Sequence, residues 1–327
     1  MKSISVVTGC FNEEENVEEL YRRVRDQFLA LGRYRYEHIF IDNASTDRTV
    51  AVLKRIASFD RNVKIIVNAR NFGHIRSPMY AIGQARGDAI ISIVADLQDP
   101  PEMIPDLIAA WEEGFSMVLC VKSSSAENQL VFRLRRRYYR LVNQLSSLET
   151  FENFTGFGLF DRKVIDHVIA FGDPYPYFRG MIAEIGLPHK KLFYDQPARK
   201  RGFSKNNLYT LYDMAILGIV NHSKVPLRFA TFCGFGGALL SFLVGMLYLA
   251  YKLLFWFSFS VGQAPMILGL FFTASMQLFF LGILGEYIGA IHTQLQRRPY
   301  AIERERVNFE YDAALPWQAA ALSEQPA

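Results

Sequence analysis

Two carboxylates and an amide lie close together at Asp96, Gln98 and Asp99, directly after an apolar run over residues 90–95. A buried run of this length, bounded by turn-forming residues, predicts the central strand of a parallel sheet. Ligands of open α/β sheets bind at the carboxyl ends of such strands. If the backbone stays extended there, Asp96 and Gln98 point to one side and offer hard oxygen ligands to one divalent cation. The alternative is a solvated acidic turn that caps the helix expected near Pro101.

The elements that would position this turn alternate between strands and helices. Strands are expected over residues 4–10, 36–42, 63–68, 90–95 and 115–121, with helical patterns between the first four. Asn12 is expected to cap the first helix, and a glycine-containing segment from Asn153 is expected to lead into a helix at Asp161. This alternation predicts a doubly wound α/β fold with a parallel sheet. No G-x-G-x-x-G follows the first expected strand, which disfavours a dinucleotide-binding domain.

The composition narrows the class of partner. The chain has 327 residues, enough for one α/β domain and something smaller, and a net charge of +4. Arg and Lys gather between residues 133 and 205, which suits a membrane-facing surface better than a nucleic-acid groove, so no nucleic acid is expected. The 3 cysteines are scattered, which favours a reduced compartment. The first ten residues hold too short an apolar run for a signal peptide, so we expect the first domain in the cytoplasm.

Two uncharged segments dominate the end of the chain. Residues 229–251 and 265–285 contain no charged side chain, and the first would extend roughly 34 Å as a helix, enough to cross a bilayer. A short Gly- and Pro-containing connection predicts a helical hairpin. Lys224 and Arg228 precede the hairpin and Arg297 and Arg298 follow it, so the positive-inside rule places both of its ends in the cytoplasm. The alternative is a buried core hairpin of a soluble protein.

Several further motifs accompany the acidic turn and the hairpin. They are FNEEEN (11–16), IDNASTD (41–47), NARNFG (68–73), ADLQDPPE (95–102), TGFGLFDRK (155–163), RGFSK (201–205) and LGEYIGAIH (284–292). With these motifs the chain resembles, over residues 1–305, a family 2 glycosyltransferase of the polyprenyl-phosphate type. Dolichyl-phosphate mannose synthases and bactoprenol glucosyltransferases are of this type; they have a GT-A fold and move a sugar from a nucleotide to a lipid phosphate.

The resemblance implies a division of the chain and a set of site residues. A cytoplasmic GT-A (Rossmann-like) catalytic domain would cover residues 1–205, a juxtamembrane amphipathic helix 206–225, two transmembrane helices 226–290 and a cytoplasmic tail 291–327. The nucleotide would be surrounded by Thr8, Glu13, Asp42 and Arg70. Mg²⁺ or Mn²⁺ on the diphosphate would be held by Asp96 and Gln98, with Asp99 completing the catalytic set. The acceptor phosphate would be received by Lys122, Arg133, Arg137, Arg199, Arg201 and Lys205.

The chain departs from the family pattern at four places. Val94 stands where many relatives have the first carboxylate of a D-x-D motif, and Asp42-Asn43-Ala44-Ser45 stands where several have N-D-G-S. His74-Ile75 replaces a lysine or glutamate pair after N-F-G, and Phe157 replaces the aspartate of the T-G-D-F motif. A phosphate acceptor is already anionic near neutral pH and needs no general base, so the loss at Phe157 is compatible with transfer.

We therefore expect an inverting, metal-dependent transferase in the inner (plasma) membrane, multi-pass, with its catalytic domain in the cytoplasm. It would move a hexose, UDP-linked, to polyprenyl (undecaprenyl) phosphate beside the lipid bilayer; a homo-oligomer is left open. One alternative is transfer to a hydroxyl of another membrane lipid, for which Asp99 or Asp161 would be the base. The other is a catalytically silent membrane scaffold.

Overall fold

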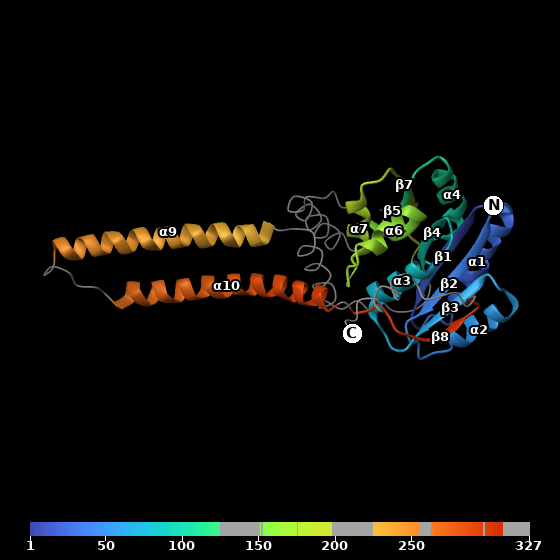
Figure 1. Ribbon diagram of the computed structural model, residues 1–327, viewed down its shortest axis with the longest axis horizontal. Helices are drawn as coiled ribbons and strands as arrows, with labels where there is room; N and C mark the ends of the chain where they lie inside the picture. The colour runs from blue at the N-terminus through green and yellow to red at the C-terminus, as the bar shows by residue number, and fades with distance from the viewer. Residues whose placement is uncertain are drawn as a thin grey trace, which may run out of the picture.

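The computed structural model describes residues 1–124, 151, 153–174, 176–197, 225–255, 263–296 and 298–309. Arg133, Arg137, Arg199, Arg201 and Lys205 of the expected acceptor site, and the expected amphipathic helix, lie outside these residues. The described chain forms a globular α/β part, from which two long helices extend side by side (Figure 1).

The globular part is built on an eight-stranded sheet with the order β7-β5-β6-β4-β1-β2-β3-β8. Its centre consists of the four parallel strands β1 (Ser3–Cys10), β2 (Arg35–Asp42), β3 (Val63–Asn68) and β4 (Ala89–Val94). Side chains on both faces of β1 and β4 are buried, since helices cover both faces. This confirms the expected parallel core and the expected strand order in the chain.

The remaining strands make the sheet mixed, which corrects the expectation of a purely parallel one. β6 (Phe154–Asp161) runs antiparallel between β4 and β5 (Met117–Ser124), and β7 (His189–Asp195) pairs parallel with β5. The glycines of β6 concealed this strand in the sequence. A Cβ at Gly158 would lie 2.4 Å from the carbonyl oxygen of Val118, so only glycine permits this close strand pairing.

Two sets of helices sandwich the sheet. On one face lie α1 (Val17–Leu31), α2 (Thr49–Phe59) and, after a short 3₁₀ turn η1 (Pro101–Met103), α4 (Ile104–Glu112). On the other face lie α3 (Gly73–Gln84), α6 (Arg162–Ala170) and α7 (Phe178–Ile185).

Asn12 does not cap the first helix, contrary to expectation. α1 begins only after Asn16, and Asn12 adopts a left-handed backbone with φ +56°. The Asn12 Oδ1 atom instead accepts the backbone N–H of Thr46 at 2.8 Å. Asn12 therefore ties the loop after β1 to the loop after β2.

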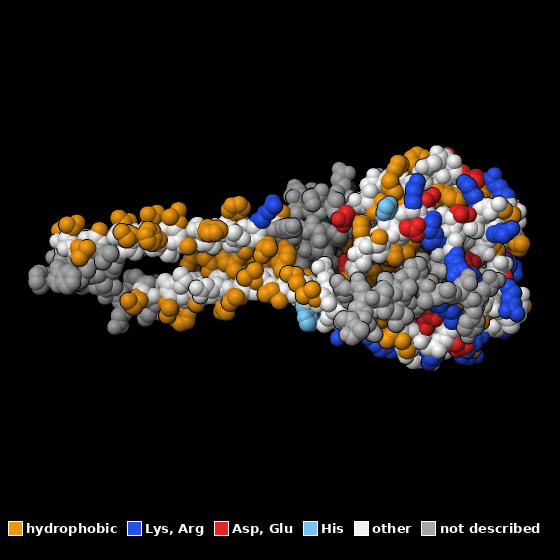
Figure 2. Space-filling view, in the orientation of Figure 1, with side chains coloured by type: hydrophobic (Ala, Val, Ile, Leu, Met, Phe, Trp, Pro, Cys, Tyr) orange, Lys and Arg blue, Asp and Glu red, His pale blue; other side chains and the backbone are white. Residues whose placement is uncertain are grey.

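The two long helices are α9 (Val225–Leu254) and α10 (Gln263–Leu295). Their segments Leu227–Leu247 and Gly269–Leu295 are long and apolar enough to cross a membrane, and neither is buried by the rest of the described chain. Figure 2 shows their hydrophobic side chains spread over the surface of both helices. Such surfaces in water would be a large unsatisfied apolar area, so a bilayer is their natural solvent.

The chain after α10 returns to the sheet, which the expectation of a separate tail over residues 291–327 missed. β8 (Glu303–Val307) pairs antiparallel with β3. The Asn308 Nδ2 group then donates to the carbonyl oxygens of Ala57 and Val63 at 2.8 and 2.9 Å. The otherwise unpaired edge of β3 offers ladder hydrogen bonds, and β8 satisfies them. The helical hairpin is therefore fastened to the globular part through the sheet itself.

Candidate active site

The carboxyl ends of β1, β2, β3 and β4 meet at one edge of the sheet, because these strands are parallel and adjacent. β6 runs the other way and so begins at this edge, with Ser92 of β4 opposite Gly158. Most of the polar residues singled out in the sequence follow these strand ends. We call the part around β1, β2 and β3, where the sequence leads us to expect the nucleotide donor, the donor end, and the part around β4, β6 and α7 the pocket end.

The donor end contains a buried network of amides. The Oδ1 atom of Asn43 accepts from Asn68 Nδ2 at 3.2 Å and from the backbone N–H of Phe72 at 2.8 Å. Its Nδ2 group donates to Asn71 Oδ1 at 2.8 Å, and Asn68 also donates to Ser77 Oγ at 2.9 Å. The network therefore fixes the loop between β3 and α3 against the end of β2.

Asp42 is fully buried at the end of β2, beside this network. Its Oδ2 atom accepts the backbone N–H of Ser45 at 2.9 Å, while its Oδ1 atom has no partner among the described residues. Burial raises the pKa of Asp42 above its usual value. A buried acceptor without a donor is costly, so this oxygen is suited to receive an N–H or O–H from a ligand.

Glu13 lies in the loop after β1, close to the start of α2. Its Oε2 atom accepts from Asn16 Nδ2 at 2.6 Å, and its backbone N–H donates to Thr49 Oγ1 at 2.9 Å. Arg70, after β3, is exposed; its guanidinium lies 4.1 Å from the centre of the Phe72 ring. Both side chains are thus at the sheet edge, where a nucleotide contact is open to them.

Thr8 differs from the other three expected nucleotide residues. It is fully buried within β1, and its hydroxyl pairs with His38 Nε2 at 3.0 Å in the layer beneath α1 and α2. The alternation of a strand places this side chain on the face opposite to α3. Thr8 was expected among the residues around the nucleotide, and in the structure its hydroxyl supports β2 from inside.

The turn after β4 is not extended, which corrects the geometry expected for Asp96 and Gln98. Leu97 has φ +59°, and the backbone N–H of Gln98 donates back to Asp96 Oδ1 at 3.2 Å. Left-handed conformations of non-glycine residues are strained and cluster at functional sites. The Gln98 Nε2 group donates to the carbonyl oxygen of Pro197 at 3.4 Å, which orients the amide and leaves its Oε1 atom for a ligand.

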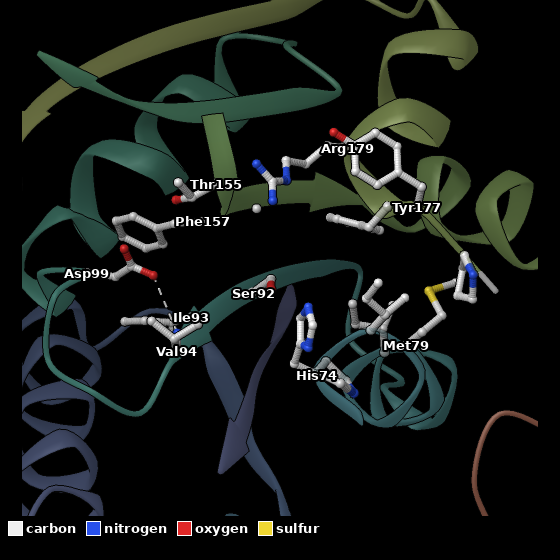
Figure 3. A pocket seen from close by; sticks show the side chains of 16 residues that line it. His74, Met79, Ser92, Ile93, Val94, Asp99, Thr155, Phe157, Tyr177 and Arg179 are labelled. Atoms are coloured by element: carbon white, nitrogen blue, oxygen red, sulfur yellow. Dashed lines mark hydrogen bonds between the residues drawn. The ribbon is translucent and has the colours of Figure 1, made fainter. Parts of the chain in front are cut away.

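Asp99 is 3% exposed, and its carboxylate is held in place by two donors. The Tyr194 hydroxyl donates to Oδ1 at 2.9 Å. The backbone N–H of Val94 donates to Oδ2 at 3.4 Å (Figure 3). Burial raises the pKa of Asp99 to about 6; the charge of Asp96 adds to the rise, whereas Tyr194 and Lys122 oppose it. Lys122 thus lies near Asp99, and the structure brings both to the same strand ends as Asp96.

Asp161, which the sequence offered as a general base, lies at the edge of the sheet opposite to the candidate site. It pairs with Ala89 at the amino end of β4. Its Oδ2 atom accepts from Trp111 Nε1 at 2.8 Å, and its Oδ1 atom accepts the backbone N–H of Lys163 at 3.1 Å, which caps α6. Asp161 is therefore structural, and it is separated from the candidate site by the length of the strand.

A pocket opens at the pocket end (Figure 3). Its lining comes from α3, β4, β6 and α7 and includes His74, Val94, Asp99, Thr155, Phe157, Tyr177 and Arg179. Tyr177 and Arg179 were missed in the sequence, because they follow no motif or periodic pattern that would distinguish them from surface residues. Only the topology, which brings α7 over the start of β6, reveals them.

No group of three or more His, Cys, Asp or Glu suited to a metal occurs in the part of the chain that is described. A cation at this site would need oxygens from a substrate as well as from the protein. The Asp96 carboxylate and the Gln98 Oε1 atom are hard oxygen donors of the kind Mg²⁺ and Mn²⁺ accept. The residues present fit such a shared site.

Comparison with known proteins agrees with this architecture. The family described as "Glycosyl transferase family 2" matches residues 5–169, and the one described as "GtrB C-terminal hairpin" matches residues 226–291. A bactoprenol glucosyl transferase of Shigella phage SfV is 34% identical over 305 residues, covering 93% of this chain and 99% of that protein. A prophage bactoprenol glucosyl transferase homolog of Escherichia coli (strain K12) is 32% identical, covering 92% of this chain and 98% of that protein. The chain therefore belongs to glycosyl transferase family 2 and has the GT-A fold, followed by a helical hairpin.

Proposed function

We propose that this glycosyltransferase moves a hexose from a nucleotide sugar to polyprenyl phosphate at a membrane surface. One observation carries the proposal. A polar site at the sheet edge and two helices long enough to cross a bilayer occur in one chain, and they are joined through β8. The relatives that align over almost all of this chain are named bactoprenol glucosyl transferases. An enzyme with a lipid acceptor must work where that lipid lies.

The donor would bind at the donor end, and we propose that it is UDP-linked. The buried Asp42 Oδ1 atom can accept an N–H of the base or a ribose hydroxyl, and Glu13 lies across the same edge. The exposed Arg70 guanidinium is suited to the diphosphate, since its planar fork pairs with phosphate oxygens. The amide network holds the loop that carries Arg70, so this half would be preorganised for the nucleotide.

We propose Asp96 and Gln98 as the protein ligands of Mg²⁺ or Mn²⁺, with the diphosphate supplying further oxygens. When bound, the cation would act as a Lewis acid that stabilises the negative charge of the departing nucleoside diphosphate. The protein's own part is positional: the Leu97 turn and the Pro197 contact hold the two ligand side chains in place.

The transfer itself would be a single displacement. An acceptor phosphate oxygen attacks C1 of the hexose, the bond from C1 to the diphosphate oxygen breaks, and the anomeric configuration inverts. The acceptor oxygen is already anionic, so no residue has to remove a proton. Lys122 lies near Asp99 and would stabilise the approaching phosphate, together with Arg133, Arg137, Arg199, Arg201 and Lys205.

One observation favours a second candidate, a lipid hydroxyl as the acceptor. Asp99 lines the pocket, and a carboxylate with a pKa of about 6 can serve as a general base near neutral pH. Both of its oxygens already accept hydrogen bonds, however, which favours a positional role. We therefore retain the phosphate acceptor as the proposal.

Radiolabelled transfer tests this directly. Purified full-length protein is incubated with labelled UDP-glucose and undecaprenyl phosphate, with and without EDTA, and the label in the organic phase is measured. Asp96→Asn should lower the rate by about a hundredfold or more while its melting temperature stays near that of the wild type. If label enters the organic phase only when diacylglycerol or ceramide replaces undecaprenyl phosphate, the acceptor is a lipid hydroxyl. Absence of transfer with every nucleotide sugar and lipid would favour a silent scaffold.

We also propose that the globular part faces the cytoplasm at the inner (plasma) membrane. α10 begins at Gln263, far from the globular part, and ends at Leu295 shortly before the chain rejoins the sheet (Figure 1). A cysteine placed at Gln263 should react with an impermeant reagent in intact spheroplasts, whereas one placed at Arg298 should not. The reverse pattern would overturn this orientation.

A further inference from the structure

The pocket has two walls that meet over the end of β4. His74 and Ile75 at the start of α3 form one wall, and Tyr177 and Arg179 at the start of α7 form the other. Val94, which is 47% exposed, belongs to the floor between them. Figure 3 shows the Arg179 guanidinium and the His74 ring directed toward the same space from opposite walls.

Arg179 is a partly buried cation that pairs with no carboxylate among the residues the structure describes. Its Nη1 group donates to the carbonyl oxygen of Phe154 at 3.3 Å, and its guanidinium lies 5.7 Å from the centre of the Tyr177 ring. Within the described ranges, no carboxylate forms an ion pair with it. A cation removed from water is costly unless a counter-charge accompanies it, and the long Phe154 contact leaves most of the guanidinium donors for a ligand.

The rest of the lining admits an anion. Asp99 is the one carboxylate among the described lining residues, and its oxygens are bonded to Tyr194 and to the Val94 backbone. Desolvation lowers the pKa of His74, and the charge of Arg179 lowers it further, so the ring is neutral near pH 7 and can donate one N–H. Ile93, Val94 and Phe157 add apolar surface without negative charge.

We propose that Arg179, with His74 opposite, binds the anionic group of a substrate in this pocket, and that this anion is the phosphate of the lipid acceptor. The assignment rests on the proposed function. It adds a phosphate ligand on α7, on the wall across from His74, to the basic residues expected from the sequence. The pocket floor ends at Val94, two residues before Asp96, so a phosphate held here would lie beside the turn that holds the departing diphosphate.

The same chemistry has a second source, which is a carboxylate on the donor sugar. A uronic acid would present an oxyanion to the same guanidinium, and Arg pairs with carboxylate and phosphate alike. The two sources differ in which substrate loses affinity when Arg179 changes. An acceptor phosphate ties Arg179 to the acceptor KM, whereas a sugar carboxylate ties it to the donor KM and to the choice of sugar.

The experiment is steady-state kinetics of Arg179→Gln and Arg179→Lys, with UDP-glucose and undecaprenyl phosphate varied separately. We expect Arg179→Gln to raise the acceptor KM by about tenfold to a hundredfold and to leave the donor KM within about twofold. Arg179→Lys should recover part of the affinity, because it restores the charge without the planar fork. Arg33→Gln, which removes an exposed arginine paired with Glu112, is the matched control and should change neither KM.

The melting temperature of each variant is measured with and without UDP. A variant that is folded and retains its donor site should show the same rise in melting temperature with UDP as the wild type. If Arg179→Gln is unstable, the acceptor KM of Arg179→Lys is measured instead, together with the affinity of wild type and Arg179→Lys for farnesyl phosphate. We expect Arg179→Lys to bind farnesyl phosphate more weakly than the wild type. An unchanged acceptor KM in an active enzyme overturns the inference and leaves the proposed function standing. A rise confined to the donor KM, with loss of a preference for UDP-glucuronate over UDP-glucose, assigns the anion to the sugar and overturns the acceptor assignment. Wild-type protein that transfers to no polyprenyl phosphate refutes the proposed function itself.

Discussion

The donor end and the pocket end lie on the same sheet edge but differ in the kinds of side chain that form them. At the donor end, Asn43, Asn68 and Asp42 are buried; Asn43 and Asp42 accept backbone N–H groups of adjoining loops, and Asn68 donates to the side chain of Asn43. At the pocket end, the strand β4 finishes in an exposed valine, and Arg179 lies on a separate helix. One end is a connected polar network, and the other is a largely apolar pocket in which Arg179 pairs with no carboxylate of the described residues.

This difference suggests that residues at the donor end tolerate substitution less well than residues at the pocket end. A buried network in which each amide satisfies others must be kept whole, since a partly satisfied one is costly. A pocket of apolar side chains can exchange them with little effect on the fold. Departures from the family pattern occur at both ends: Val94, His74, Ile75 and Phe157 line the pocket, and Asp42-Asn43-Ala44 stands at the donor end where several relatives have N-D-G.

The largest stability effect should come from breaking the amide network. Asn43→Ala removes the acceptor of the Phe72 N–H and of Asn68, both of which remain buried. We expect a loss of about 2–4 kcal/mol in the free energy of unfolding, because several buried groups lose their partners at once. Urea unfolding of the detergent-solubilised protein, followed by intrinsic fluorescence, measures this loss.

Val94→Asn is the matched change at the pocket end. Val94 is 47% exposed, so an amide there stays hydrated and the free energy of unfolding should change by less than about 0.5 kcal/mol. If the two variants lose equal stability, the contrast between a connected end and a tolerant end is wrong.

A second prediction uses the pH dependence of Asp99. Its pKa in the folded protein is about 6, above the value of about 3.9 for an unfolded aspartate, so the folded state holds the proton more tightly. The contribution of Asp99 to stability is therefore fully present below pH 4 and is lost as the pH rises to about 6, by at most about 3 kcal/mol.

Asp99→Asn removes this titration. The difference in melting temperature between variant and wild type should move in favour of the variant between pH 4 and 6 and stay constant above pH 7. A difference that is flat across the whole range would show that burial does not raise the pKa of Asp99, and that the hydrogen bonds from Tyr194 and Val94 offset the cost of burying its charge.

The sequence was sufficient to predict the parallel core, the hairpin and the edge of the sheet that carries the site. Apolar runs such as residues 90–95 and the uncharged segment 229–251 have one dominant physical explanation each. The strand β6 was not predicted, because its glycines are typical of a loop and acquire meaning only through the close approach to Val118. β8 was not predicted because its alternating charges, ERERV, show no buried face.

The candidate site shows the same limit. Asp96 and Gln98 were predicted as a pair, but the extended geometry was wrong, since a left-handed Leu97 cannot be inferred from a residue type that avoids that conformation. Thr8 is buried because helices cover both faces of β1, and the strand sequence did not disclose which of the two layers its side chain enters. Arg179 required the fold of α7 over β6. Local chemistry was therefore predictable, and its orientation was not.

The smallest predicted effect concerns Ala44 at the donor end, where several relatives have glycine. Ala44 has φ +63°, a conformation that costs a non-glycine residue about 1–2 kcal/mol, whereas glycine adopts it freely. Ala44→Gly relieves this strain but adds unfolded-state entropy, so we expect a net gain of about 0.5–1 kcal/mol in the free energy of unfolding. The control is Ala51→Gly on the exposed side of α2, which should lose about 0.5–1 kcal/mol because glycine weakens a helix. Urea unfolding of both variants measures the opposite signs. A loss at both positions would mean that the loop after β2 relaxes around Ala44, and that the donor end is less rigid than its hydrogen bonds imply.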